Sequence, residues 1–223
     1  MTHNFFSVTT FTILKFYATF GVQITNLFVS VNCIEMLSGL DIVIVLDSSA
    51  SVGLANWELV KQYVVNLILE NKSKKVQFGL VVFSSRATVQ FTLDQYSDIN
   101  DLQEAVYSIP YSPGGTNLAD AMMVAREQIF KQAGNRKESW DVLILIIDGA
   151  PNINIELTAS QIALTKEEGM IIYAVGIGPD VDIQQLTSTA NEPDFMLLTD
   201  FEVLNRAPYP LMDAICENDL FSK

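Results

Sequence analysis

Apolar residues occur along the chain in two kinds of pattern, short continuous runs and longer stretches with helical spacing. The runs Leu40–Leu46, Val142–Ile147 and Met170–Gly176 contain few polar residues, which predicts strands buried on both faces of a sheet. Two further strands are predicted at Val76–Phe83 and Phe195–Leu198. Between the strands, apolar residues recur at helical spacing and predict helices over Asn56–Glu70, Asp98–Ser108, Asn117–Gln132, Thr158–Glu168, Asp182–Ala190 and roughly Phe201–Cys216.

One segment departs from both patterns. In Ala87–Leu93 apolar and polar residues alternate, and only the short turn Ser84–Arg86 separates this segment from the strand Val76–Phe83. A connection this short predicts antiparallel pairing and an edge position. The other strands alternate with helices. The whole pattern therefore predicts an α/β, doubly wound, Rossmann-like fold with a mostly parallel six-stranded sheet, one antiparallel edge strand and helices on both faces.

Polar residues follow two of the predicted strands directly. The D-x-S-x-S segment Asp47–Ser51 comes after the strand that ends at Leu46, and Asp148 comes after the strand that ends at Ile147. A third polar segment, Gly114–Asn117, opens a predicted helix. Each segment alone is consistent with a turn or a helix cap. Because ligand sites in such folds lie at the carboxyl ends of the central strands, the three together predict one shared site.

Composition and charge limit the class of protein. The chain has 223 residues, of which 49% are hydrophobic and 17% charged, as expected for one globular domain with an N-terminal extension. The net charge is −13 and the sequence pI is about 4.3. No cluster of Lys and Arg interrupts this acidity, so nucleic-acid binding is not expected. The acidity is compatible with cation binding or basic partners, and also with an ordinary soluble surface.

The first 31 residues differ from the rest of the chain. From Phe5 to Val31 the only charged residue is Lys15. This stretch predicts a secretory signal sequence or, since it is nearly long enough to span a bilayer, a signal anchor. An ordinary N-terminal strand is the remaining alternative. The domain is then expected at residues 33–218 with a tail at 219–223, in a protein that is secreted or held at the cell surface.

Two cysteines, Cys33 and Cys216, bracket the predicted domain. Both positions can lie on the same side of an open α/β sheet, where a disulfide would join the two ends and stabilise the fold by up to about 5 kcal/mol. Two unrelated buried thiols are the alternative. A disulfide would indicate an oxidising compartment, and the glycosylation sequon at Asn71 is compatible with export.

Given these segments, the chain resembles the von Willebrand factor type A domain with its metal-ion-dependent adhesion site (MIDAS), most of all the secreted and matrix members. The resemblance runs from about Leu40 to Cys216. Besides the polar segments, it is carried by Asn56–Lys61, Phe78–Ser84, Pro110–Asn117 and Val142–Gly149. The chain departs from the family at Ile147, where threonine is usual, and at Ala50, where glycine is frequent.

The resemblance implies a binding site for Mg²⁺ or Mn²⁺. In this family the residues matching Ser49, Ser51 and Thr116 coordinate the metal, and those matching Asp47 and Asp148 act mainly through bound water. Hydroxyl ligands are neutral, so the cation keeps most of its positive charge and prefers an anionic oxygen at its open position. The expected partner is an extracellular-matrix or cell-surface protein that offers a Glu or Asp. No nucleic acid and no small-molecule substrate is expected.

An enzymatic function is not expected, and no catalytic residue is assigned. The only histidine, His3, lies in the N-terminal stretch, and no phosphate-binding loop occurs in the sequence. Two alternatives stay open. One is a metal-dependent phosphohydrolase using Asp47 and Asp148, and the other is an intracellular type A domain acting as an assembly scaffold.

Positions near the site give further expectations. Leu54, Ser85 and Asn152 are expected on its rim. Met122 and Met123, in the helix after Thr116, are expected to pack in the core.

Overall fold

The computed structural model describes residues 39–206 of the chain. At its centre lies a six-stranded sheet with the strand order β3-β2-β1-β4-β5-β6. The strands are β1 (Leu40–Asp47), β2 (Val76–Phe83), β3 (Ala87–Phe91), β4 (Trp140–Ile147), β5 (Ile171–Ile177) and β6 (Met196–Thr199). All eight residues of β1 are buried, as its apolar run predicted for a central strand.

Neighbouring strands pair in parallel except at one edge of the sheet. β1 pairs in parallel with β2 and β4, and β5 pairs in parallel with β4 and β6. β3 pairs antiparallel with β2 and lies at the edge, which confirms the prediction from its alternating pattern. The strand order reverses between β1 and β4. The carboxyl ends of these two strands therefore form the topological switch point, where such folds bind ligands.

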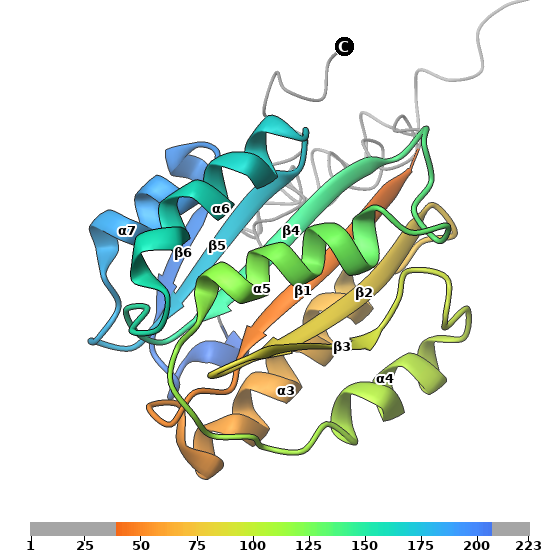
Figure 1. The fold of residues 1–223 in the computed structure, drawn as a ribbon. Coiled ribbons are helices and arrows are strands. Elements are labelled where there is room, and N and C mark those ends of the chain that lie inside the picture. Colours follow the sequence, from red (N-terminus) through yellow and green to blue (C-terminus); the bar gives the residue numbers. More distant parts are fainter. Residues whose placement is uncertain (1–38, 207–223) are drawn as a thin grey trace, which may run out of the picture.

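Helices cover both faces of the sheet (Figure 1). α3 (Gly53–Glu70) lies behind the sheet with α4 (Ile99–Tyr107) packed beside it, and α5 (Leu118–Ala125) and α6 (Ile155–Glu167) lie in front. α7 (Ile183–Thr189) packs against β5. Three short helical turns complete the described chain: η1 (Arg126–Phe130), η2 (Pro193–Phe195) and η3 (Leu204–Arg206). The predicted α/β, doubly wound architecture is confirmed.

Helix boundaries differ from the predicted ones by more than one residue at four places. α3 and α6 each begin three residues early, at Gly53 and Ile155, because the exposed first turns of these helices do not follow the apolar spacing. The helix predicted after Thr116 changes at Arg126 to a π-helix, which apolar spacing does not reveal. No helix begins at Phe201, since a turn and η3 occupy residues 201–206. The rest of that predicted helix lies outside the described residues.

The two methionines of α5 have different environments. Met122 is fully buried, as predicted, whereas Met123 is 41% exposed. Successive helix residues point about 100° apart, so one of two adjacent side chains on a helix that covers a sheet turns outward. The prediction that Met123 packs in the core was wrong.

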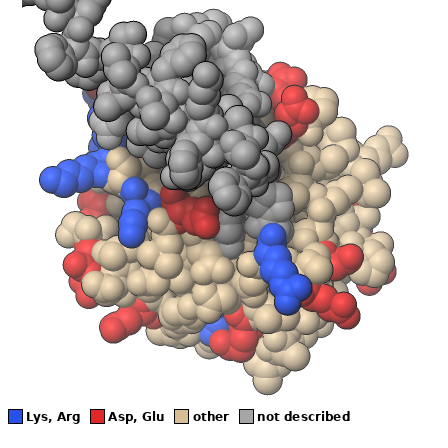
Figure 2. Space-filling model, turned by 180° about the vertical axis from the view of Figure 1, so that it is seen from behind, with Lys and Arg blue, Asp and Glu red and all other residues tan. Residues whose placement is uncertain are grey.

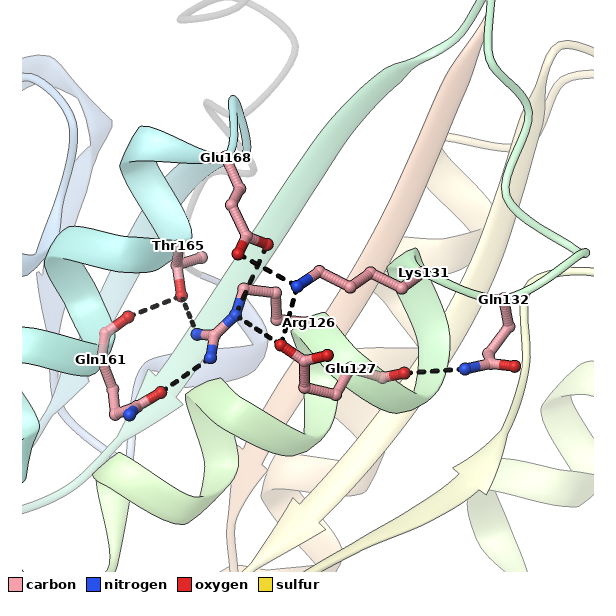
Figure 3. A network of polar contacts seen from close by, with 7 residues as sticks. All are labelled: Arg126, Glu127, Lys131, Gln132, Gln161, Thr165 and Glu168. Carbon is pink, nitrogen blue, oxygen red and sulfur yellow. Dashed lines mark hydrogen bonds and ion pairs between the residues drawn. The ribbon is translucent and has the colours of Figure 1, made fainter.

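A buried arginine joins η1 to α6 (Figure 3). Arg126 is 4% exposed, and its guanidinium donates to Gln161 Oε1 at 2.9 Å and to Thr165 Oγ1 at 3.4 Å. Its Nε lies 3.2 Å from Glu127 Oε1 and 3.5 Å from Glu168 Oε2. Both carboxylates are part-exposed, so their charges stay hydrated while the guanidinium is satisfied. The network fixes the helix after Thr116 against the helix after Asp148.

Charges of both signs are spread over the face seen in Figure 2. Lys and Arg side chains there lie among Asp and Glu side chains, so the net charge is not gathered in one area of this face. Within residues 39–206, no helix combines the length and the apolarity that crossing a membrane requires.

Several predicted features fall outside the described residues, namely the signal sequence or anchor at 1–31, Cys33, Cys216 and the tail at 219–223. Asn71 is described, and it is buried as the C-cap of α3. Its Nδ2, the atom that would carry a glycan, donates to Leu67 O at 2.7 Å. Glycosylation would require this side chain to leave its buried position, so the structure disfavours the sequon as a modified site.

Candidate metal site

Two neighbouring strands carry the aspartates of the predicted site. Asp47 is the last residue of β1, and Asp148 directly follows β4. The two strands pair in parallel, so both carboxylates reach the same edge of the sheet. Both side chains are buried. They meet at the switch point, as the order of the predicted elements indicated.

Serine hydroxyls connect the two aspartates. Asp47 Oδ1 accepts a hydrogen bond from Ser49 N at 2.7 Å, which turns the chain back over the end of β1. The Ser49 and Ser51 hydroxyl oxygens are 2.9 Å apart. Both hydroxyls donate to Asp148 Oδ1, Ser51 at 2.9 Å and Ser49 at 3.4 Å. Four of the five predicted residues therefore form one hydrogen-bonded group.

Thr116 reaches the site on a different segment, the loop between α4 and α5. It is 3% exposed. Ala50 N donates to Gly114 O at 2.9 Å, which ties this loop to the loop after β1. Asn152 Oδ1 accepts from Thr116 N at 2.8 Å, and Asn152 N donates to Thr116 O at 3.0 Å. Among the described residues, no hydrogen bond joins the Thr116 hydroxyl to the other four side chains. The loop that carries Thr116 is instead hydrogen-bonded to the loop after β1 and to the segment after β4.

Two glycines allow the loops to approach this closely. A Cβ atom on Gly114 would lie 2.6 Å from Ser85 Oγ, and one on Gly115 would lie 2.5 Å from Ile153 Cδ1 and 2.8 Å from Asn152 Oδ1. These distances are shorter than van der Waals contact. A side chain at either position would therefore push against Ser85 or Asn152, whose side chains accept hydrogen bonds from the backbone of the loop that carries Thr116.

The residues expected on the rim divide into two kinds. Leu54 is 67% exposed, as a rim residue should be. Ser85 and Asn152 are also exposed, and both hold the backbone of the central loop, because Ser85 Oγ accepts from Gly115 N at 2.9 Å and Asn152 Oδ1 accepts from Thr116 N. These two side chains position the loop that carries Thr116.

The site has more negative charge and more acceptors than the protein satisfies. Burial, together with the charge of Asp148, raises the pKa of Asp47 to about 7. Burial also raises the pKa of Asp148. Asp47 Oδ2 is buried and has no hydrogen-bond partner among residues 39–206. A cation here would satisfy this oxygen and favour the ionised form of both carboxyl groups.

The donor atoms indicate the kind of cation. The predicted residues offer two carboxylates and three hydroxyls, all hard oxygen donors that suit Mg²⁺ or Mn²⁺. In the part of the chain that the structure describes, no group of three or more His, Cys, Asp or Glu side chains is placed to hold a metal. A metal in this region therefore depends on hydroxyl ligands, and the residues at the switch point fit a hard divalent cation.

Tyr111 and Ser48 link the loops through hydrogen bonds that the sequence did not predict. The Tyr111 hydroxyl donates to Ser49 O at 3.0 Å and accepts from Gly53 N at 3.1 Å. Ser48 Oγ donates to Ser112 O at 3.2 Å. These partners are far apart in sequence, so local spacing gives no signal for them. Only the position of Tyr111 within a family-like segment pointed to it.

The chain is similar to known proteins over most of its described length. The family model of the von Willebrand factor type A domain matches residues 41–208. The chain is 32% identical to the collagen alpha-4(VI) chain of Mus musculus over 184 residues, 79% of this chain and 8% of that protein. It is 31% identical to matrilin-4 of Homo sapiens over 188 residues, 80% of this chain and 30% of that protein.

Solved structures of one matrix protein have a similar fold. The structure of proximal thread matrix protein 1 (PTMP1) from the mussel byssus has a TM-score of 0.69 and 26% identity, covering 81% of this chain and 46% of that one. A second structure of PTMP1, with a zinc-occupied MIDAS motif, has a TM-score of 0.70 and 28% identity. The chain thus spans less than half the length of each of these proteins.

Proposed function

Because the chain belongs to the von Willebrand factor type A domain family, we propose that it is an adhesion module that binds an acidic residue of a protein ligand through a divalent cation. The proposed cation is Mg²⁺ or Mn²⁺, held by Asp47, Ser49, Ser51, Thr116 and Asp148. The relatives are extracellular-matrix proteins, so we place this protein outside the cell and its partner in the matrix or on a cell surface.

The observation that carries the proposal is the unpartnered Oδ2 of Asp47. A buried carboxylate oxygen without a donor is costly in a folded protein, and here it lies at the switch point beside hydroxyls that already converge on Asp148. Hydrogen bonds among the site residues satisfy Asp47 Oδ1 but leave Oδ2 unpaired. A bound cation supplies the missing charge.

The hydroxyl and carboxylate residues have different proposed roles because their charges differ. When bound, the cation acts as a Lewis acid that attracts an anionic oxygen. The hydroxyls of Ser49, Ser51 and Thr116 are neutral and leave its positive charge largely in place. Asp47 and Asp148 offset part of that charge and can hold metal-bound waters. Such a site attracts a carboxylate from a partner, which is binding without any covalent change.

The oxygen-only donor set also bears on which metal is used. Zinc occupies the MIDAS motif in a structure of PTMP1. Zinc sites in proteins usually contain nitrogen or sulfur ligands, whereas Mg²⁺ and Mn²⁺ prefer oxygen. The site proposed here offers only oxygen, so we propose Mg²⁺ or Mn²⁺ as the working ion.

We extend the proposal to the ends of the chain. The family match at residues 41–208 lies inside the proposed domain at 33–218. A disulfide between Cys33 and Cys216 and a secretory segment at residues 1–31 would suit a protein of the matrix.

Calorimetric titration with Mg²⁺ and with Mn²⁺ tests the site. We expect the wild type to bind either ion and Asp47→Ala to bind at least about tenfold more weakly, the loss typical of altered metal-site partners. Asp101→Ala, which removes an exposed carboxylate of α4, is the control and should bind like the wild type. Absence of binding by the wild type would overturn the assignment. Retention of matrix proteins on the immobilised protein, with and without a chelator, then tests metal-dependent adhesion.

A further inference from the structure

The hydroxyl of Tyr111 bridges two parts of the loop that carries Ser49 and Ser51. It donates to Ser49 O at 3.0 Å and accepts from Gly53 N at 3.1 Å. Gly53 is the first residue of α3, and the N-cap residue Val52 has no side chain that could accept this N–H. The first N–H groups of a helix need acceptors from outside the helix. Tyr111 therefore supplies a cap that the local sequence lacks.

The ring of Tyr111 is held by α3. Its centroid lies 5.9 Å from that of Trp57, a fully buried residue whose Nε1 donates to Ile109 O at 3.3 Å. One turn further along α3, the buried Lys61 donates to Tyr107 O at 2.9 Å. The segment before Tyr111 is thus fixed to α3, and the first N–H group of the same helix donates to the tyrosine hydroxyl.

The Tyr111 contacts join the two loops that carry the hydroxyl ligands of the proposed site. Tyr111 belongs to the loop that leads to Thr116, and its hydroxyl fixes the backbone between Ser49 and Gly53. Ser48 Oγ adds a second link between these loops through Ser112 O at 3.2 Å, and Ala50 N adds a third through Gly114 O at 2.9 Å. The backbone that carries the Ser49 and Ser51 hydroxyls is therefore positioned largely by the loop of Thr116.

We propose that Tyr111 is a positioning residue that orders the Ser49–Ser51 loop for the metal. This inference rests on the proposed function, since it assigns Tyr111 a part in the same cation site. Mg²⁺ demands near-octahedral geometry at short ligand distances, so small rotations of two hydroxyl-bearing residues lower the affinity. Pre-organised ligands bind more tightly because the loop is already ordered before the ion arrives.

Tyr111→Phe tests this role, because it removes the hydroxyl and keeps the ring against Trp57. We expect its dissociation constants for Mg²⁺ and Mn²⁺, measured by calorimetry, to rise about five- to tenfold, as for the loss of one or two neutral hydrogen bonds. The melting temperature of the metal-free protein, measured in chelator, should fall by only a few degrees. Tyr107→Phe is the matched control, since the Tyr107 hydroxyl donates to Gln62 Oε1 on the surface at 2.8 Å. It should leave the metal affinity unchanged.

The outcomes separate this inference from the proposed function. If the wild type and Tyr107→Phe bind metal and Tyr111→Phe binds it more weakly, Tyr111 has the proposed role. If all three proteins bind metal equally, the inference is wrong while the metal site stands, and a lowered melting temperature of Tyr111→Phe alone would then show a merely structural role. If the wild type binds no metal, the proposed function itself fails.

Discussion

Asp47 has two carboxylate oxygens with different environments, and this difference governs the site. Oδ1 accepts the N–H of Ser49 and shapes the loop, whereas Oδ2 is buried without a partner. Burial disfavours the charged form, and the negative charge of Asp148 adds to this effect, so the pKa of Asp47 rises to about 7. In the metal-free protein, the fold therefore disfavours the ionised form of Asp47, which is the form that a cation would bind.

A pH prediction follows for the metal-free protein. The folded-state pKa of Asp47 lies above its unfolded value of 3.8, so between these values the folded state keeps a proton that the unfolded state has lost. This contribution to stability is complete below about pH 4 and is lost as the pH rises to about 7. Asp47→Asn keeps the Oδ1 acceptor and has no proton to lose. In chelator at pH 7.5 we expect this variant to exceed the wild type in unfolding free energy by about 2 kcal/mol.

Urea unfolding in chelator at pH 5.0 and pH 7.5 measures this difference. The gap between Asp47→Asn and the wild type should widen toward pH 7.5, and an equal gap at both pH values would contradict the assigned cause. Calorimetry should show the opposite pH dependence for metal affinity. The Mg²⁺ affinity of the wild type should rise over the same pH interval, since the ion and the proton compete for one carboxylate.

At the scale of the elements, hydrogen bonds hold the loops at the switch point to one another. The loop after β1 is bonded to the loop before α5, and that loop is bonded in turn to the segment after β4. Gly115 lies at the closest approach, where a Cβ atom would meet Ile153 Cδ1 at 2.5 Å and Asn152 Oδ1 at 2.8 Å. The absence of a side chain at this position allows Asn152 to bond the backbone of Thr116.

Gly115→Ala should therefore damage the site through the Thr116 loop. Overpacking of this kind typically costs about 1–3 kcal/mol of unfolding free energy, and we expect Mg²⁺ affinity to fall about tenfold as Thr116 shifts. Gly149→Ala is a matched control at the same site, because the nearest atom to its added Cβ is Ser51 Oγ at an ordinary 3.9 Å. Urea unfolding measures the change in stability of both variants, and calorimetry measures the change in their Mg²⁺ affinity. Equal effects of the two substitutions would show that the close contact at Gly115 does not control the site.

Elements and site residues differed in how far sequence could predict them. The strands followed from their apolar runs, and Asp47 and Asp148 met because they end neighbouring parallel strands, which the fold class implies. Thr116 and Tyr111 lie on a loop that follows no strand, and hydrogen bonds to residues far away in the sequence hold them in place. Periodicity carries no information about such contacts. Family resemblance pointed to Thr116 as a ligand, and only the coordinates showed the contacts of Tyr111.

At the scale of the whole molecule, net charge opposes the proposed interaction unless a cation is bound. A partner carboxylate approaches a protein of net charge −13, and the site itself adds two carboxylates. Without an ion, like charges repel at the point of contact. In the proposed site, the ion would offset the charge of the two carboxylates and offer an open position to an anionic oxygen. We therefore expect a partner's acid to bind more tightly when the metal is present.

At the opposite ends of the strands, the buried Asp41 forms an ion pair with the part-exposed Arg136. Asp41, near the start of β1, is 0% exposed. The Nε and backbone N of Arg136 donate to its two oxygens at 2.8 and 2.7 Å. Arg136 also donates to Lys75 O at 3.0 Å, which joins the turn before β4 to the turn before β2. Among the described residues, one end of the strands thus holds Asp41 paired with Arg136 beside an unpaired buried oxygen, Asp141 Oδ1, and the other end holds the unpaired Asp47 Oδ2.

Mutations at one end of the strands should not affect the other end. Arg136→Met leaves Asp41 buried without its cationic partner, a change that typically costs about 3–5 kcal/mol. The metal residues lie at the other ends of the strands, so Mg²⁺ affinity of the folded variant should stay within about twofold of the wild type. Lys137→Met, at the neighbouring exposed position, is the control for surface charge and should change neither quantity. Urea unfolding and calorimetry on the same preparations measure both. If Arg136→Met also lost metal affinity, the strands would transmit the change from one end to the other. The ion pair would then contribute to metal binding as well as to stability.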